Sequence, residues 1–198
     1  MCIICVSPKG VQQPSIATIR TMFRRNPHGA GYMCVRDGKV FISKGFMNED
    51  AFVDVIRYER FTPSDPVVYH FRISTQAGVN PEMTHPFPLS RNRSDMKALD
   101  LFCRCGVAHN GVIQLTTDPE NGEYSDTAIL VTDYLADLIR KPSDLRNKTM
   151  LKLIERLAGS KLAIMDDTGY IATVGKFIDE YGLLYSNSSY LAFGRRAG

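Results

Sequence analysis

The chain has 198 residues, of which 44% are hydrophobic and 23% charged, with a formal net charge of +3. This ordinary globular composition excludes a disordered chain, and the length is typical of one domain spanning residues 1–198. The lysines and arginines are too scattered, and the charge too small, to indicate nucleic acid as a partner. No apolar run approaches the ~20 residues of a membrane span. Because the start MCIICVSPKG also lacks the features of a secretory signal, we expect a cytoplasmic protein that contacts no membrane.

The first third of the sequence predicts strands and helices in alternation. An apolar run directly at the N-terminus is typical of a buried strand, and apolar residues at helical spacing follow Pro14. Asp37-Gly38 between two alternating segments indicates a β-hairpin. The elements expected here are a strand at Cys2–Ser7, a helix at Pro14–Arg25, hairpin strands at Gly31–Arg36 and Lys39–Lys44, a helix at Glu49–Arg60 begun by Asn48, and a strand at Val67–Arg72.

The rest of the chain predicts a long loop, then more strands around a pair of helices. The stretch Thr75–Asp95 is polar and shows no obvious element, and loops of this length are more often functional than accidental. The elements expected after it are one strand at Ala98–Ala108, a helix from Ser125 or Asp126 to Arg140 with Ile129, Leu130, Tyr134 and Leu138 in the core, a helix at Leu145–Leu157, and strands at Lys161–Met165, Tyr170–Val174 and Leu183–Ser186. Hairpins imply antiparallel pairing, so the pattern favours a layered α+β fold, and it leaves other α+β arrangements open.

The cysteines point to a nucleophile or a ligand, because five thiols in a reducing compartment are not expected to form disulfides. Cys2 follows the initiator Met1 and is small enough for methionine aminopeptidase to remove that residue. Removal would leave a free α-amine, whose pKa is ordinarily about 7.7–8.0, on the residue that carries the thiol. One residue could then supply both the nucleophile and the base. The simpler alternative is that Cys2 is a small strand residue without a chemical role.

Four further segments place polar groups at strand ends or at a helix start, where such groups converge on a pocket. They are Tyr69–Thr75, Thr84–Phe87, Val107–Gly111 and Ser125–Thr127. In this order, behind an N-terminal cysteine, they resemble the class II glutamine amidotransferases, which are N-terminal-nucleophile (Ntn) hydrolases. The resemblance runs from Cys2 to the Tyr185–Asn187 region. It implies a four-layer α-β-β-α sandwich with mostly antiparallel sheets, and a reaction that needs neither a metal nor another cofactor.

The resemblance also implies a catalytic group. Cys2 would attack the side-chain amide of free L-glutamine, and its amine would act as base and then protonate the departing ammonia. Asn110, through its side-chain amide, and Gly111, through its backbone N–H, would form the oxyanion hole. A tight turn is the simpler interpretation of Asn110-Gly111.

The same resemblance implies a substrate clamp. Arg72 would hold the substrate α-carboxylate and Asp126 the α-ammonium, which would select free glutamine over peptide-bound glutamine. Thr75 and His85 would complete the pocket. Arg72 as a surface ion-pair partner and Asp126 as a helix N-cap are the simpler alternatives. We expect the other histidines to be structural, because this mechanism needs no imidazole.

The sequence departs from the family pattern at two places. In the stretch Arg25–Gly31 the Gly-Ala-Gly is kept, but His28 stands where many members carry an acidic residue. After Arg72, the run Gln76–Gly78 occupies a position at which members vary. The contacts made by the loop around His28 and by Gln76 are therefore open.

A metal site is the main competing chemistry, and the spacing disfavours it. Cys2 and Cys5 are three positions apart on an expected strand, so their side chains point to opposite faces. Cys103 and Cys105 would share a face near His109, but about 6.6–6.8 Å apart in an apolar stretch. We expect no metal.

Three other functions remain as alternatives. The first is a catalytically silent binding or regulatory module with the same fold, and the second is an Ntn hydrolase of another amide. A papain-like protease would use His109 or His85 as its base, but its nucleophile is normally found at a helix start. Because the chain ends at Gly198 without room for an acceptor domain, we expect a separate synthetase or acceptor-domain protein as the partner.

Overall fold

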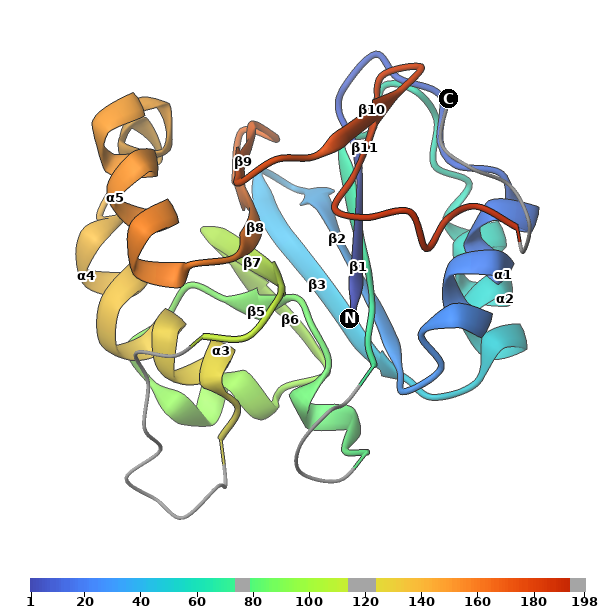
Figure 1. Cartoon of the computed structure of the whole chain (residues 1–198), viewed down its shortest axis with the longest axis horizontal. Coiled ribbons are helices and arrows are strands. Elements are labelled where there is room, and N and C mark those ends of the chain that lie inside the picture. The colour runs from blue at the N-terminus through green and yellow to red at the C-terminus, as the bar shows by residue number, and fades with distance from the viewer. Residues whose placement is uncertain (74–78, 114–123, 193–198) are drawn as a thin grey trace.

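The structure, a computed structural model, describes residues 1–73, 79–113 and 124–192 and has a mixed α+β fold with two antiparallel sheets (Figure 1). The larger sheet has seven strands. Their order is β10 (Ile178–Glu180), β11 (Leu183–Tyr185), β1 (Ile3–Ser7), β4 (Val67–Phe71), β2 (Ala30–Arg36), β3 (Lys39–Phe46) and β6 (Asp100–Cys103). The N-terminal strand β1 is thus an interior strand, paired with β4 on one side and with β11 on the other.

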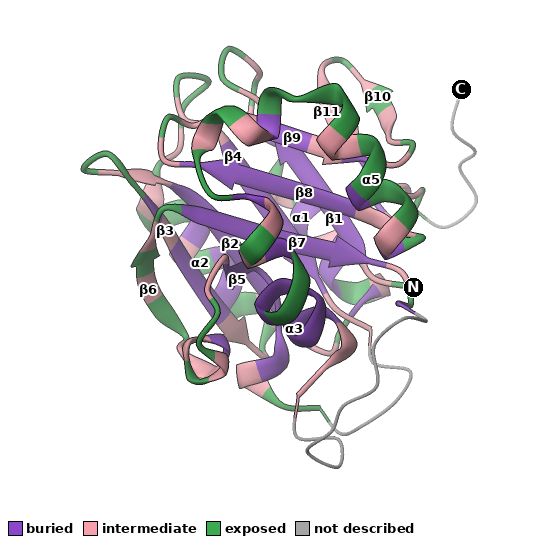
Figure 2. Cartoon of the chain, turned by 90° about the vertical axis from the view of Figure 1, so that its left-hand side faces the viewer, coloured by how far each residue is buried: buried purple, intermediate pink, exposed green. Residues whose placement is uncertain are grey.

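The smaller sheet has four strands and carries the candidate residues of the second half of the chain. Their order is β5 (Phe87–Pro88), β7 (Cys105–Asn110), β8 (Lys161–Asp166) and β9 (Ile171–Val174). All of its pairings are antiparallel, and β7 pairs with β8 over its whole length. Figure 2 shows β7 and β8 buried along nearly all of their length.

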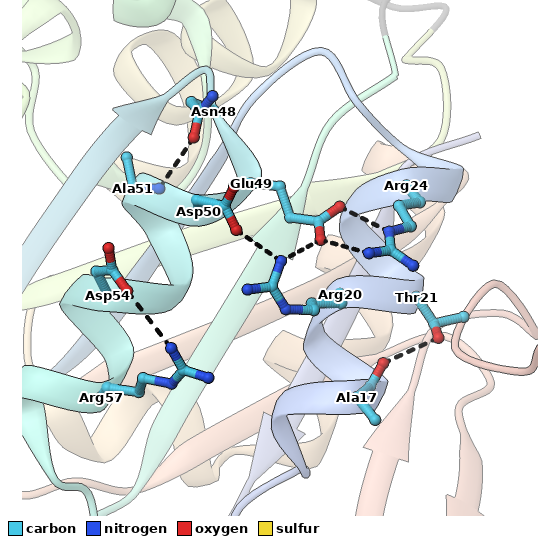
Figure 3. Close-up of polar contacts among 10 residues, drawn as sticks. All are labelled: Ala17, Arg20, Thr21, Arg24, Asn48, Glu49, Asp50, Ala51, Asp54 and Arg57. Atoms are coloured by element: carbon cyan, nitrogen blue, oxygen red, sulfur yellow. Dashed lines mark hydrogen bonds and ion pairs between the residues drawn. The ribbon is translucent and has the colours of Figure 1, made fainter.

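Helices α1 (Ile16–Arg25) and α2 (Glu49–Glu59) lie side by side on the larger sheet (Figure 1). Ser15 and Asn48 cap their N-termini by accepting hydrogen bonds from the backbone N–H groups of Thr18 and Ala51. An ion-pair cluster joins the two helices (Figure 3). The Glu49 carboxylate accepts from both Arg20 and Arg24, and Asp50 accepts from Arg20 at 2.8 Å.

A second group of helices lies on the smaller sheet. It comprises α3 (Asp126–Ile129), a π-helical segment (Leu130–Leu135), α4 (Ala136–Leu138), a 3-10 turn (Pro142–Arg146) and α5 (Lys148–Ala158). Their buried apolar residues form one cluster with those of the smaller sheet. None of the described helices is long and apolar enough to serve as a transmembrane segment.

The core consists of three apolar clusters, and β1 contributes to two of them. Ile3 and Cys5 pack with the residues of α1 and α2. Ile4 and Val6 pack on the opposite face against Ala108 and other residues of the smaller sheet. Because successive side chains of a strand alternate between faces, burial of both faces explains the unbroken apolar run at the N-terminus. The prediction that Cys2 and Cys5 point to opposite faces agrees with this alternation.

The predicted strand Ala98–Ala108 is wrong as a single element. It consists of β6 in the larger sheet and β7 in the smaller one, with Arg104 between them. β6 pairs with β3, whereas β7 pairs with β5 and β8. Cys103 and Cys105 therefore do not share one face of a strand, and the Cys103 thiol donates a hydrogen bond to the Cys105 carbonyl oxygen at 3.1 Å.

The prediction that Thr75–Asp95 is a polar loop without elements is also wrong over its described part. The described part contains a 3-10 turn (Pro81–Met83) and β5, and a second turn (Arg93–Lys97) begins in it. It also buries Met83, Thr84, His85 and Phe87. The segment is fastened by Lys44, whose buried Nζ donates to the carbonyl oxygens of Glu82 and Met96, each at 2.6 Å. The loop sequence alone could not predict this contact, because Lys44 lies in β3, far from the loop in the chain.

The predicted helix of residues 126–140 forms, but with an interruption that changes its buried face. The expected core residue Tyr134 is 38% exposed, whereas the next residue, Leu135, is fully buried. A π-helical turn holds one residue more than an α-helical turn, so it rotates all later side chains about the helix axis. This explains why the α-helical spacing placed Tyr134 on the wrong face.

Candidate active site at the start of strand β1

Cys2 directly precedes β1 and is half-buried. Its Sγ accepts a hydrogen bond from the backbone N–H of Ile73 at 3.4 Å and lies 3.6 Å from the Ile73 carbonyl oxygen. Burial raises the pKa of the Cys2 thiol above its ordinary value, while the hydrogen bond from Ile73 and the positive charge of Arg72 act in the opposite direction. While Met1 is attached, the Cys2 nitrogen is a peptide amide and cannot act as a base.

Arg72 follows β4 and is brought next to Cys2 by strand register. Ile3 pairs with Phe71 in the antiparallel β1–β4 ladder, so the residue before β1 neighbours the residue after β4. Burial lowers the pKa of Arg72, whereas its electrostatic interactions with Cys2 and Asp126 raise it. The Nη1 atom of Arg72 is buried and has no hydrogen-bond partner among residues 1–73, 79–113 and 124–192. A buried guanidinium nitrogen in this state suits an anionic ligand.

The Gly-Ala-Gly stretch holds Arg72 in place. The Arg72 backbone N–H donates to the Gly29 carbonyl oxygen at 2.7 Å, and the His28 N–H donates to the Arg72 carbonyl oxygen at 2.9 Å. Gly29 has φ +114°, and a Cβ there would lie 2.6 Å from the Thr84 methyl carbon. The stretch therefore packs against the segment that carries His85.

Asn110 ends β7, close to the start of β1. Its Nδ2 donates to Ser186 Oγ at 2.9 Å, and the same oxygen accepts from the backbone N–H of Ile4 at 2.9 Å. The Oδ1 atom of Asn110 is buried without a partner in the described part of the chain. Gly111 follows with φ +149°, and a Cβ there would overlap the Cβ of Ser160. Glycine is thus required at the position that the resemblance assigns to the second oxyanion donor.

Asp126 is the first residue of α3. Ser125 is the N-cap, because its Oγ accepts from the Ala128 N–H at 3.2 Å, so the alternative that Asp126 is the N-cap is wrong. The Asp126 carboxylate accepts from the backbone N–H of Ile113 at 2.9 Å and from that of Thr127 at 2.7 Å. These contacts hold Asp126 in electrostatic range of Arg72.

His70, His85 and His109 form a buried cluster. His70 Nε2 donates to the His109 carbonyl oxygen at 2.9 Å, and His85 Nδ1 lies 3.1 Å from the same oxygen. Burial lowers the pKa of His70 to about 3 and that of His109 to about 4, and it also lowers the pKa of His85. The three rings are therefore neutral at physiological pH. His85 is placed among the other two histidines, where its Nδ1 lies 3.2 Å from His70 Nε2.

Thr75, expected in the pocket, and Gln76, whose contacts were left open, lie outside the described residues. Sequence reasoning assigned no role to Ser186 or Asn187, although Asn187 Nδ2 donates to the Cys2 carbonyl oxygen at 2.6 Å. The sequence pattern at these two residues is a weak indication of a site, because a surface turn after a strand has the same short polar stretch. In the described part of the chain, no three His, Cys, Asp or Glu side chains converge as metal ligands.

The comparisons with known proteins add no relative, since no protein-family model and no curated protein matches this chain. What the site can do follows from its groups. A thiol, a half-buried guanidinium and a carboxylate lie around one strand end, with a buried amide near by. Such a set is complementary to a small zwitterion that carries an electrophilic carbon.

Proposed function

We propose that this chain is a class II glutamine amidotransferase-type glutaminase, in which Cys2 hydrolyses the side-chain amide of free L-glutamine. The observation that carries the proposal is the convergence at the start of β1. Cys2 contacts Ile73, Arg72 interacts electrostatically with both Cys2 and Asp126, and Asn110 reaches Ser186 beside β1. These residues come from five separate parts of the chain.

The fold supports the same proposal. Two antiparallel sheets share an apolar cluster, and each sheet carries helices on its other face. This arrangement agrees with an α-β-β-α sandwich of the Ntn-hydrolase type. In such a fold the nucleophile lies at the start of an interior strand, and Cys2 directly precedes the interior strand β1.

The chemistry requires that Met1 be removed. The freed α-amine of Cys2 takes the thiol proton, and Sγ attacks the amide carbon of glutamine. Asn110 and Gly111 stabilise the oxyanion, the amine returns its proton to the leaving nitrogen, and ammonia departs from a thioester. A water molecule, deprotonated by the same amine, hydrolyses the thioester to glutamate and restores the thiol.

The charged groups define the substrate. The unpartnered Nη1 of Arg72 suits the α-carboxylate, and the Asp126 carboxylate suits the α-ammonium. A peptide-bound glutamine lacks both charges on its Cα. We infer that the substrate is the free amino acid and that a separate synthetase or acceptor-domain protein consumes the ammonia.

A catalytically silent module that binds glutamine is the second candidate. The observation that favours it is the burial of the Cys2 thiol, which raises its pKa while Met1 is attached. In this alternative Met1 stays in place, the thiol remains protonated, and glutamine binds without hydrolysis.

Assaying the processed protein separates the two candidates. Mass spectrometry establishes the loss of Met1, and glutamate and ammonia are then measured after incubation with glutamine. The proposal expects hydrolysis by the wild type, none by Cys2→Ala, and none by a variant in which a Lys inserted after Met1 prevents processing. A diazo-ketone analogue of glutamine should label Cys2 and spare the fully buried Cys5. Calorimetric binding of glutamine without any glutamate formation from processed protein would instead establish the silent module.

A further inference from the structure

A chain of hydrogen bonds leads from the end of α5 to the Asp126 carboxylate. Ser160 Oγ lies 2.7 Å from His109 Nε2, and His109 Nδ1 lies 2.7 Å from Thr127 Oγ1. Thr127 Oγ1 lies 3.2 Å from Asp126 Oδ1. The mechanism above uses Asp126 but none of the other three residues, although His109 and Thr127 are almost fully buried.

The proton positions in this chain follow from the Ser160 hydroxyl. Ser160 Oγ lies 2.9 Å from the Ala158 carbonyl oxygen, which can only accept. The single hydroxyl proton is therefore used there, and Ser160 must accept from a proton on His109 Nε2. Burial keeps the His109 ring neutral, so its Nδ1 carries no proton. His109 Nδ1 then accepts the hydroxyl proton of Thr127.

This assignment determines the environment of Asp126. Thr127 Oγ1 is within donating distance of both His109 Nδ1, at 2.7 Å, and Asp126 Oδ1, at 3.2 Å. Its single proton goes to the nearer acceptor, His109 Nδ1, so the hydroxyl does not donate to Asp126 Oδ1. The carboxylate keeps the backbone hydrogen bonds from Ile113 and Thr127, and it retains acceptor capacity for a cation. If His109 Nδ1 instead carried the proton, Nδ1 would donate to Thr127. The hydroxyl would then turn to Asp126 and weaken its attraction for an ammonium group.

We propose that Ser160, His109 and Thr127 are positioning residues. They direct the Thr127 hydroxyl proton to His109 instead of Asp126, and so set the preference for substrates with an α-ammonium group. The inference rests on the proposed function, because it needs Asp126 to face the substrate. It goes further in assigning a specificity role to a hydrogen-bond chain that does not itself touch the substrate.

The test compares glutamine with glutaramate, which has the same amide and carboxylate but no α-amino group. Ser160→Ala removes the acceptor for His109 Nε2 and favours the other tautomer, while Ser160 is only half-buried and its Cβ is retained. We expect the ratio of kcat/KM for glutamine to that for glutaramate to fall about tenfold, mainly through the KM for glutamine. His109→Leu should act in the same direction.

A second substitution distinguishes this role from general damage. Adding Thr127→Val to Ser160→Ala removes the hydroxyl that would turn to Asp126, so the ratio should recover towards the wild-type value. Thr127→Ser added to Ser160→Ala keeps the hydroxyl and should not restore it. Thermal unfolding of all variants checks the fold.

The outcomes separate the two proposals. If processed wild type hydrolyses glutamine but Ser160→Ala and His109→Leu leave the substrate ratio unchanged, the positioning role is wrong and the glutaminase stands. Equal use of glutaramate and glutamine by the wild type also overturns the positioning role. If the wild type neither hydrolyses nor binds glutamine, the proposed function fails and the inference fails with it.

Discussion

The side-chain amide of Asn187 donates a hydrogen bond to the backbone carbonyl oxygen of Cys2 at 2.6 Å, although the two residues are 185 positions apart. The neighbouring Ser186 N–H donates to the Ile4 carbonyl oxygen at 3.0 Å, so the chain after β11 runs along the start of β1. The segment 186–187 therefore holds the proposed nucleophile by its backbone and leaves the thiol free to react.

Asn187→Ala should lower kcat for glutamine hydrolysis, because the backbone of Cys2 loses a partner that orients it. One lost hydrogen bond should also reduce the free energy of unfolding by about 1 kcal/mol, which lowers Tm by about 2–4 °C. The matched control is Asn147→Ala, which removes the N-cap of α5 at a similar cost in stability. Equal loss of kcat in both variants would contradict a specific role for Asn187.

Arg72→Lys should raise the KM for glutamine and leave kcat nearly unchanged, because the α-carboxylate keeps its charge from ground state to transition state. A point ammonium cannot reproduce the planar guanidinium fork, so kcat/KM should fall about ten- to a hundredfold. Steady-state kinetics measures both constants. Arg104→Lys, at an exposed ion pair 3.9 Å from Asp167, serves as the control. An unchanged KM in Arg72→Lys would mean that the carboxylate binds elsewhere.

Asn110→Ala should lower kcat and leave KM nearly unchanged, the opposite of the effect expected for Arg72→Lys. The oxyanion exists only after attack, so kcat should fall by about 10²–10³ with little change in KM. Ser186→Ala breaks the same Asn110–Ser186 hydrogen bond but keeps the amide, and it should cost much less activity. A larger loss in Ser186→Ala than in Asn110→Ala would indicate that Asn110 only supports the fold.

The buried histidines should make stability fall in mild acid. The pKa values of His70 and His109 are about 3 and about 4 in the folded chain, below the ordinary value of 6.5. Well above pH 6.5 both rings are neutral in the folded and in the unfolded chain, so their burial costs no deprotonation and their full contribution to the free energy of unfolding is present. As the pH falls towards 4, the unfolded chain binds protons that the folded chain does not, so the free energy of unfolding drops by about 1.4 kcal/mol per pH unit for each ring.

Urea unfolding between pH 7 and pH 5 measures this slope. His70→Asn should make the slope shallower. The same slope in His70→Asn and the wild type would show that His70 is not the neutral buried group described here.

Local signals predicted much of the secondary structure, because each depends on a few neighbouring residues. Asp37-Gly38 turns the hairpin between β2 and β3, and Asn48 caps α2, as expected. The break between β6 and β7 carries no such signal, since it depends on which strands pair with each half. The π-helical turn that exposes Tyr134 escaped the pattern for a similar reason, because packing rather than periodicity selects it.

The candidate site also has a part that the sequence predicted and a part that only tertiary packing decided. Position next to Met1 indicated Cys2 from the sequence, and the resemblance singled out Arg72, Asn110 and Asp126 at strand ends and at a helix start. Their proximity was decided only by the tertiary structure, through the β1–β4 register and the return of the chain at Ser186. The burial that leaves Arg72 Nη1 unpartnered, and the hydrogen bonds that orient His109, also depend on residues far away in the chain. Residue type carries chemical capacity, but distance, burial and proton position arise only when separate segments pack together.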